Sequence, residues 1–330
     1  MAEHVRVREV GLRDGLQLVR TVVPADRKLE WCRRAVAAGV KEMEITSFVP
    51  SKVLPQFGDT TEIVLGARAI AGLEMSALVP NLKGAERAFE VGMPKINYVL
   101  SASEQHNLAN VRRSTADSLT DFSRIIAARD AQPGADRIEV AGGIATAFGC
   151  AIAGEVAQDR VVEIANKLLE SGADELIVAD TVGYANPAQV RSLLGAIVRQ
   201  AGTVPVVAHF HDTRGLGLAN VVAALDIGVR AFDASLGGLG GCPFAPGATG
   251  NINTEDCVYL LDSMGFETGI DVDALVKLRA LVGSWIPEET LTGAIARAGL
   301  PKTYRIDVLT RPGGALVKPS VPVGRAIGSG

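Results

Sequence analysis

The feature that most constrains the fold of this 330-residue chain is a repeat, in which short Val- and Ile-rich runs alternate with longer segments of helical periodicity. Such alternation is the pattern of βα units, in which each strand is followed by a helix. About eight strand-like runs lie near residues 5–10, 42–46, 75–79, 96–101, 137–141, 176–179, 204–209 and 231–235. Eight such units predict an α/β fold that closes into a (β/α)8 TIM barrel.

The segments between the strand-like runs carry helix start and stop signals, and the first strand–helix turn favours a closed barrel over an open sheet. Pro24 opens a segment that ends at Gly39, and Pro187 opens one that ends near Gly202, as expected for helices with Pro at the start and Gly at the end. An open doubly wound sheet usually has fewer strands and a GxGxxG turn after the first of them. The corresponding turn here, residues 11–15, reads Gly-Leu-Arg-Asp-Gly and lacks that pattern.

The chain is longer than a barrel of roughly 250 residues, which suggests one large domain with an appendage. We expect residues 1–268 to form the catalytic barrel, and residues 269–330 to form C-terminal helices and a tail packed on it. Apolar residues make up 48% and charged residues 21% of the chain, which is enough for a sizeable core.

Charge and cysteine spacing limit the partners. The formal net charge is only -4, with no long run of one sign, which argues against nucleic acid or a membrane surface and favours a small-molecule substrate. The start of the chain is polar and no window holds eighteen consecutive apolar residues, so we expect a soluble cytoplasmic protein. We also expect a homo-oligomer of two or more copies. The four cysteines are widely spaced and contain no CxxC pair, so neither a disulfide framework nor a structural zinc site is indicated.

Polar residues gather just after the predicted strands rather than before them. In a TIM barrel all strands end at one face, where the loops build the site. We therefore expect a single active site from the residues that follow the strands, namely Arg13, Asp14, Glu44, Ser47, Asn81, Ser101, Asp180, Thr181, His209 and His211.

A histidine pair indicates a metal site at this face. His209 and His211 are two residues apart on a strand, so their side chains leave the same side while Phe210 points the other way. Asp14, after the first strand, is the best-placed third ligand, and Asn251 is a plausible fourth. This mixed nitrogen and oxygen set suits Mg²⁺, Mn²⁺, Zn²⁺ or Co²⁺. The alternative is that the histidines only form hydrogen bonds inside the barrel mouth.

Five segments, in the same order from about Val5 to about Gly269, resemble the 3-hydroxy-3-methylglutaryl-CoA lyase family of metal-dependent TIM-barrel lyases and aldolases. They are residues 9–17 (EVGLRDGLQ), 44–48 (EITSF), 80–84 (PNLKG), 209–213 (HFHDT) and 238–256 (GLGGCPFAPGATGNINTED).

The resemblance implies that Asp14, His209, His211 and Asn251 hold a divalent metal ion, Mg²⁺ or Mn²⁺ before Zn²⁺ or Co²⁺. It also implies catalytic roles for four residues. Arg13 would lie beside the substrate carbonyl, Cys242 would act as an acid or base in a Gly-rich loop, and Glu44 and Asp180 match active-site positions of the family. We further expect that four residues contact the acyl-CoA, namely Gln17, Asn81, Lys83 and Ser101. For Lys83, a CoA phosphate and plain solvent are equally good partners.

The implied reaction is retro-Claisen cleavage of 3-hydroxy-3-methylglutaryl-CoA to acetyl-CoA and acetoacetate, a step of leucine catabolism. Several departures leave the acyl group open, among them Leu12 in place of Pro and Arg214 in place of Tyr. The alternatives are citramalyl-CoA, a longer-branched acyl-CoA, a synthase or aldolase reaction on a 2-oxo acid, or a silent barrel that only binds. The roles of Arg214 and of His106, at the rim or on a surface helix, stay open.

Overall fold

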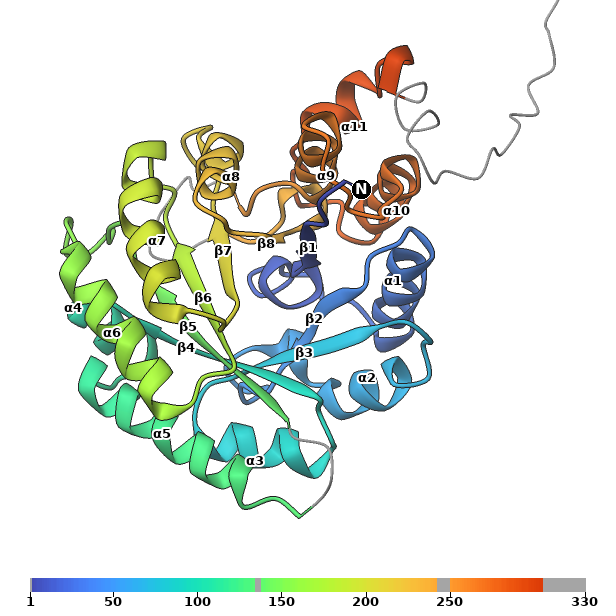
Figure 1. The fold of residues 1–330 in the computed structure, drawn as a ribbon. Helices are drawn as coiled ribbons and strands as arrows, with labels where there is room; N and C mark the ends of the chain where they lie inside the picture. The colour runs from blue at the N-terminus through green and yellow to red at the C-terminus, as the bar shows by residue number, and fades with distance from the viewer. Residues whose placement is uncertain (1, 134–137, 242–249, 305–330) are drawn as a thin grey trace, which may run out of the picture.

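The computed structural model describes residues 2–133, 138–241 and 250–304. Eight parallel strands close into a barrel in chain order, from β1 beside β2 round to β8 beside β1. Figure 1 shows helices around the outside of this barrel. The strands are β1 (Arg6–Glu9), β2 (Glu42–Ser47), β3 (Glu74–Val79), β4 (Lys95–Ser101), β5 (Glu139–Ala145), β6 (Glu175–Asp180), β7 (Val206–Phe210) and β8 (Ala231–Ala234).

The strands are separated by helices, and several of these begin where the sequence places a cap. Asn186 and Gln189 form a capping box ahead of α7, with Pro187 at its first position. The helices are α1 (Ala25–Ala37), α2 (Thr60–Ala67), α3 (Leu82–Glu90), α4 (Glu104–Val111), α5 (Thr115–Asp130), α6 (Gln158–Ser171), α7 (Pro187–Ala201), α8 (Gly217–Asp226), α9 (Thr254–Ser263), α10 (Val272–Trp285) and α11 (Ala294–Ala298). Short helical turns lie at η1 (Gly11–Gly15), η2 (Pro55–Phe57) and η3 (Leu236–Gly238).

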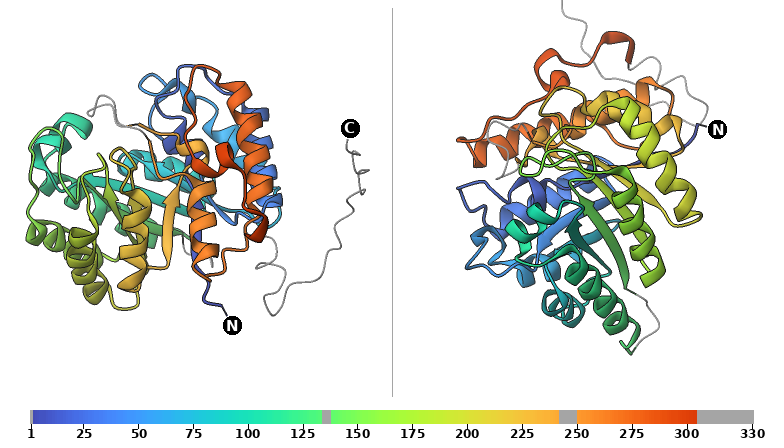
Figure 2. Two further views of the ribbon diagram at one scale, coloured as in Figure 1. Left: turned by 90° about the horizontal axis from the view of Figure 1, so that it is seen from above. Right: turned by 90° about the vertical axis from the view of Figure 1, so that its left-hand side faces the viewer.

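This architecture confirms the predicted TIM barrel and the helical extension after it. The extension packs back on the barrel: α10 contacts α1, and the guanidinium of Arg27 lies 5.8 Å from the ring centroid of the buried Trp285. In the left view of Figure 2 the orange C-terminal helices lie beside the blue N-terminal part of the chain. The division at residue 268 stays a prediction. None of the helices in the described part of the chain is long and apolar enough to span a bilayer.

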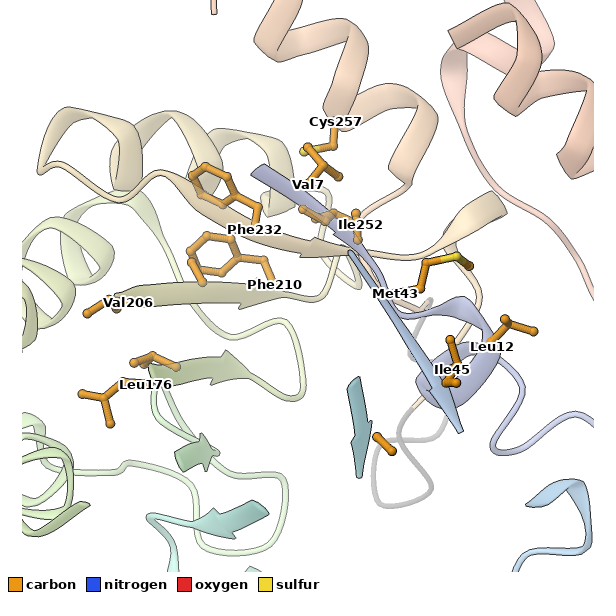
Figure 3. Packing of buried hydrophobic residues seen from close by; sticks show 14 of the residues in the cluster. Val7, Leu12, Met43, Ile45, Leu176, Val206, Phe210, Phe232, Ile252 and Cys257 are labelled. Carbon is orange, nitrogen blue, oxygen red and sulfur yellow. The ribbon is translucent and has the colours of Figure 1, made fainter. Parts of the chain in front are cut away.

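The main apolar core lies between the barrel wall and the helices. Val7 on β1, Phe210 on β7 and Phe232 on β8 point outward into this layer, with Ile252 and Cys257 beside them (Figure 3). Strand residues alternate between two faces, so the outward turn of Phe210 is what directs His209 and His211 into the barrel. The predicted direction of Phe210 is therefore confirmed.

The interior of the barrel is largely polar toward the N-terminal ends of the strands. Buried charges from five strands form a layer there. Arg8 bonds Glu175 and Asp233, and Lys95 lies 2.7 Å from Glu42 and 3.0 Å from Glu175. Each charge has an opposite partner, as burial requires.

The carboxylate of Glu255, buried outside this layer, predicts a pH dependence of stability. Glu255 on α9 accepts a hydrogen bond from the Gly237 N–H at 3.1 Å, lies 3.5 Å from Arg279 Nε, and has a pKa that burial raises to about 8. The raised pKa means that its stabilising contribution is complete below the ordinary pKa and is lost as pH rises through about 8. We expect the free energy of unfolding to fall by on the order of 3 kcal/mol between about pH 6 and pH 9.

Denaturant titrations across this pH range measure the effect. Glu255→Gln should remove much of this fall in the free energy of unfolding. Part of the fall should remain, because burial also raises the pKa of the neighbouring Glu9 to about 7. The exposed Glu86→Gln variant should retain the wild-type profile. If Glu255→Gln kept the full wild-type pH dependence, the assignment would be wrong.

Candidate active site

The loop after β1 delivers Arg13 and Asp14 to the barrel mouth through a single turn of π-helix, η1. Its wide hydrogen bonds run from Gly15 N–H to Val10 O at 3.3 Å and from Leu16 N–H to Gly11 O at 2.8 Å. Turns of π-helix are rare in proteins, and those that occur frequently lie at functional sites. The extra residue in the turn lets Arg13 and Asp14 lie at the mouth while Leu12 is buried.

Three predicted metal ligands meet at the mouth. One potential ligand atom each from Asp14, His209 and His211 lies within 4.8 Å of the other two. Asn251 joins them through the backbone, because Ile252 N–H donates to Phe210 O at 2.9 Å and residue 251 pairs with His211 in an isolated bridge. The Asn251 amide then donates to Asp14 Oδ2 at 2.6 Å.

The donor atoms of this group fit a divalent ion. Among the described residues, His211 Nδ1 and Asn251 Oδ1 are buried and have no hydrogen-bond partner. Buried polar atoms are nearly always paired, so two unpaired lone pairs beside a carboxylate mark a site that an ion would complete. Two imidazoles with carboxylate and amide oxygens are ligands for Mg²⁺, Mn²⁺, Zn²⁺ or Co²⁺.

The electrostatics of the group suit cation binding as well. Burial, with the neighbouring His209, lowers the pKa of His211 to about 4, so this ring is neutral near pH 7. Burial opposes ionisation of Asp14, but Arg13 and the two histidines outweigh it and lower its pKa. Burial would likewise lower the pKa of His209, yet its hydrogen bond to Asp233 and the charge of Asp14 raise it.

Arg13 is held beside Asp14 by two carboxylates. Its Nε donates to Glu44 Oε2 at 2.5 Å and its Nη1 to Asp14 Oδ1 at 2.7 Å. Glu44 is itself fixed by a 2.9 Å hydrogen bond from Asn97 on β4. Among the described residues neither contact of Arg13 uses Nη2, which is left for a substrate oxygen.

Asp180 ends β6 on the same face. It accepts hydrogen bonds from the backbone N–H groups of Tyr184 at 2.8 Å and Ala185 at 3.1 Å. Burial raises its pKa to about 6 in spite of these donors. A carboxylate with a pKa near neutrality can exchange protons at physiological pH.

The predicted substrate contacts are placed less uniformly. Gln17 is half-buried and follows η1, and the Asn81 side chain caps α3 by accepting from Gly84 N–H at 2.9 Å. Lys83 is exposed on the first turn of α3. Ser101 is buried at the end of β4, and its Oγ lies 2.7 Å from Nδ1 of His106. Their roles stay predictions.

His106 lies buried on α4 rather than exposed on it. Arg214 stacks on the Tyr184 ring at 4.5 Å and donates to the carbonyls of Val182 and Gly183. It lines a cavity of about 530 Å³ between loops of β5, β6 and β7. Cys242 lies outside the described residues, so its predicted role rests on the sequence alone.

Two residues of the site were not predicted. Asp233 on β8 accepts from His209 Nδ1 across 3.1 Å, and Asn97 on β4 holds Glu44. The sequence contains a signal for both, because each is a polar residue inside a strand, two positions from another strand residue that faces the interior. A single strand does not tell which neighbour such a residue meets.

Gly240 leaves no room beside the candidate ligands. It has a φ of +104°, and an added Cβ would lie 2.5 Å from Asn251 Nδ2 and 3.1 Å from Asp14 Oδ2. We expect Gly240→Ala to weaken Mn²⁺ binding about tenfold by displacing these two side chains. Isothermal titration with Mn²⁺ measures the effect.

Gly228→Ala is the matched control, because Gly228 has a φ of +94° but nothing within 4 Å of the added Cβ. Both variants carry similar backbone strain. Equal Mn²⁺ affinity in the two variants would contradict the steric explanation.

Comparison with known proteins shows which proteins this chain is similar to. A family model described as HMGL-like matches residues 4–282. The hydroxymethylglutaryl-CoA lyase YngG of Bacillus subtilis is 39% identical over 86% of this chain and 93% of its own length, and the (R)-citramalyl-CoA lyase of Chloroflexus aurantiacus is 41% identical over the same shares. An HMG-CoA lyase structure from Acinetobacter baumannii, in complex with coenzyme A and 3-methylmalate, is 39% identical with a TM-score of 0.84, covering 91% of this chain and 96% of that one.

Proposed function

The chain belongs to the HMGL-like family of carbon–carbon lyases, and from this premise we propose that it cleaves a 3-hydroxy-3-methylglutaryl-CoA-type thioester to acetyl-CoA and acetoacetate. The family membership confirms the resemblance found in the sequence. The observation that carries the proposal is the convergence of Asp14, His209 and His211 beside Arg13 at one barrel mouth. We assign the ion to these three ligands and Asn251, with Mg²⁺ or Mn²⁺ ahead of Zn²⁺ or Co²⁺.

The reaction needs a base, a charge for the enolate and a proton donor. The hydroxyl proton leaves, the electron pair of the adjacent C–C bond moves into the thioester, and a new ketone remains on the departing acid. The enolate carbon then takes a proton to give acetyl-CoA, so no water or redox partner is consumed. A bound divalent ion would lower the pKa of the substrate hydroxyl and fix its orientation.

The side chains of this chain supply the rest. Arg13 places a permanent positive charge where the thioester oxygen becomes negative. Glu44 and Asp14 hold its guanidinium plane in place through Nε and Nη1. Asp180 is the carboxylate whose pKa of about 6 suits acceptance of a proton at neutral pH.

We propose Cys242 as the donor that protonates the enolate carbon, on the basis of its Gly-rich sequence context. Cys242→Ala is expected to lower kcat by about 10²-fold, the lower end for loss of a general acid, with Mn²⁺ affinity unchanged. Steady-state thioester cleavage measures this. Cys257→Ala is the control, because Cys257 is buried in the helical layer. Wild-type turnover by Cys242→Ala would rule out the assignment.

The second candidate substrate is (R)-citramalyl-CoA. A relative that acts on it is 41% identical to this chain, comparable to the hydroxymethylglutaryl-CoA lyase relatives. The two thioesters differ by one methylene between the hydroxyl-bearing carbon and the free carboxylate, a difference that pockets discriminate by only about 10- to 200-fold. Arg214, at the mouth, is the charged residue in which this chain departs from the lyase pattern.

A panel of 3-hydroxyacyl-CoAs with products identified by mass tests the proposal. Acetyl-CoA with acetoacetate supports the first substrate, and acetyl-CoA with pyruvate supports the second. Condensation of acetyl-CoA with a 2-oxo acid instead would identify a synthase, and metal binding without any turnover would identify a silent barrel. The homo-oligomer, the cytoplasmic location and the role in leucine catabolism stay predictions.

A further inference from the structure

A line of buried contacts runs through the barrel interior from the ion layer to the candidate metal site. Glu175 on β6 bonds Nη1 of Arg8, whose Nε donates to Asp233 Oδ1 at 2.7 Å. The other oxygen of Asp233, Oδ2, lies 3.1 Å from Nδ1 of His209. All four side chains are buried, and each has an exposed fraction of 10% or less.

We propose that Asp233 is a positioning residue, which holds His209 with its proton on Nδ1 and its Nε2 lone pair toward Asp14, and that Arg8 fixes the orientation of Asp233. The proposal rests on the metal site of the proposed function. It adds which nitrogen of His209 would bind the ion, and which residues of this chain select that nitrogen.

The geometry leaves one arrangement of protons. Arg8 is always a donor, so Asp233 Oδ1 accepts from it and Oδ2 remains as the acceptor for His209. An ionised carboxylate has no proton to give, and so Nδ1 of His209 must carry the hydrogen. The guanidinium of Arg8, which donates to Oδ1 at 2.7 Å, stabilises the ionised form of this carboxylate.

The opposite nitrogen of His209 is then free to bind an ion. Nε2 lies 4.0 Å from Asp14 Oδ2, too far for a hydrogen bond and within the span of two metal–ligand bonds of roughly 2.1 Å each. Carboxylates behind a metal-binding imidazole orient the ring and select its tautomer. Asp233 stands in that relation to His209.

The second histidine of the pair is held differently. Among the described residues, Nδ1 of His211 has no hydrogen-bond partner, and its backbone pairs with residue 251 in an isolated bridge. The two imidazoles are therefore not equivalent. The tautomer of His209 is set by the protein before an ion arrives, and loss of Asp233 should act through His209 alone.

Asp233→Asn tests the proposal, because it keeps the shape and reverses the hydrogen bond. Arg8 still requires an acceptor, so the Asn oxygen should turn to Arg8 and the Asn NH₂ group should face His209. His209 Nδ1 must then accept, which moves its proton to Nε2 and blocks the lone pair. We expect Mn²⁺ to bind about 10- to 100-fold more weakly, measured by electron paramagnetic resonance of free Mn²⁺.

Lys95→Met is the matched control. It disturbs the same buried layer, where Lys95 Nζ lies 2.7 Å from Glu42 and 3.0 Å from Glu175, but it removes no contact of Arg8 or of His209. Its thermal stability is expected to fall while its Mn²⁺ affinity stays at the wild-type value. Equal weakening by Lys95→Met and Asp233→Asn would overturn the proposal, because the effect would then come from general damage to the layer.

A test on the wild-type protein does not depend on whether a variant folds. The chain has four histidines, so ¹⁵N-histidine spectra of the Mg²⁺-loaded protein contain few ring signals. We expect His209 to show a protonated Nδ1. A proton on Nε2 in place of Nδ1 would overturn this inference but not the metal site. Wild-type Mn²⁺ affinity in a folded Asp233→Asn variant would do the same. Failure of the wild-type protein to bind Mn²⁺ would instead refute the metal site itself and the inference with it.

Discussion

Arg13→Lys is expected to lower kcat for thioester cleavage by about 10²- to 10³-fold, the usual cost of losing a preorganised donor at an oxyanion. The guanidinium reaches Glu44 with Nε and Asp14 with Nη1, which leaves Nη2 for the substrate. A lysine ammonium is a point charge without this planar fork. It can satisfy the carboxylates or meet the developing enolate oxygen, but it cannot do both in one geometry.

Steady-state kinetics and Mn²⁺ titration together test this expectation. KM and Mn²⁺ affinity should change far less than kcat, because the lost contact is made mainly in the transition state. Arg230→Lys is the control, since Arg230 lies ahead of β8 and bonds Glu3 and local carbonyls at the other end of the barrel. A kcat within about threefold of wild type in Arg13→Lys would contradict the role of the guanidinium.

The barrel could be predicted because its signal is repeated eight times and does not depend on any one boundary. The least accurate strand was the fifth, expected at residues 137–141 and observed as Glu139–Ala145. Gly142 and Gly143 lie in the part of this strand beyond residue 141. They continue it because a Cβ on Gly142 would lie 3.1 Å from Leu168, and one on Gly143 2.8 Å from Val99. Close packing across the wall, invisible in a local pattern, explains the extension.

The convergence of the candidate metal ligands could be predicted because strand alternation and chain order both constrain where these residues lie. His209 and His211 share a face by periodicity alone, and Asp14 follows the first strand. The π-turn that positions Asp14 had no signal in the sequence. Asn251 reaches the site through a backbone bridge to β7, a pairing that becomes visible only when the chain is folded.

Residues that act through others could not be identified from the sequence. Asp233 reads as one polar residue in a short strand, and its meaning depends on Arg8 and His209, which are 225 and 24 residues away. For the expected substrate contacts, the sequence predicts where the backbone lies but not where the side chain points. A position after a strand places the backbone at the mouth, but side chains such as those of Asn81 and Lys83 can still cap a helix or enter solvent.

Exhaustive chelation is expected to lower thioester cleavage by at least about 10³-fold, and Mg²⁺ or Mn²⁺ is expected to restore it. Without an ion, His211 Nδ1 and Asn251 Oδ1 stay unpaired, and Arg13 is the remaining permanent positive charge at the site. Loss of several kcal/mol of charge stabilisation corresponds to a factor of that size. Activity that survives at undetectable metal content would refute the metal role.

Thermal unfolding separates a catalytic ion from an inhibitory chelator. An ion that binds only the folded protein stabilises it by about 2.7 kcal/mol at a concentration of 100 Kd, so Tm should rise when Mn²⁺ is returned. His211→Ala should lose this rise together with activity, because it removes a neutral ring whose buried Nδ1 has no hydrogen-bond partner among the described residues. Ca²⁺ should restore little, since it favours six to eight oxygen ligands over imidazoles. A Tm that responds equally to Mn²⁺ in wild type and His211→Ala would place the ion elsewhere on the protein.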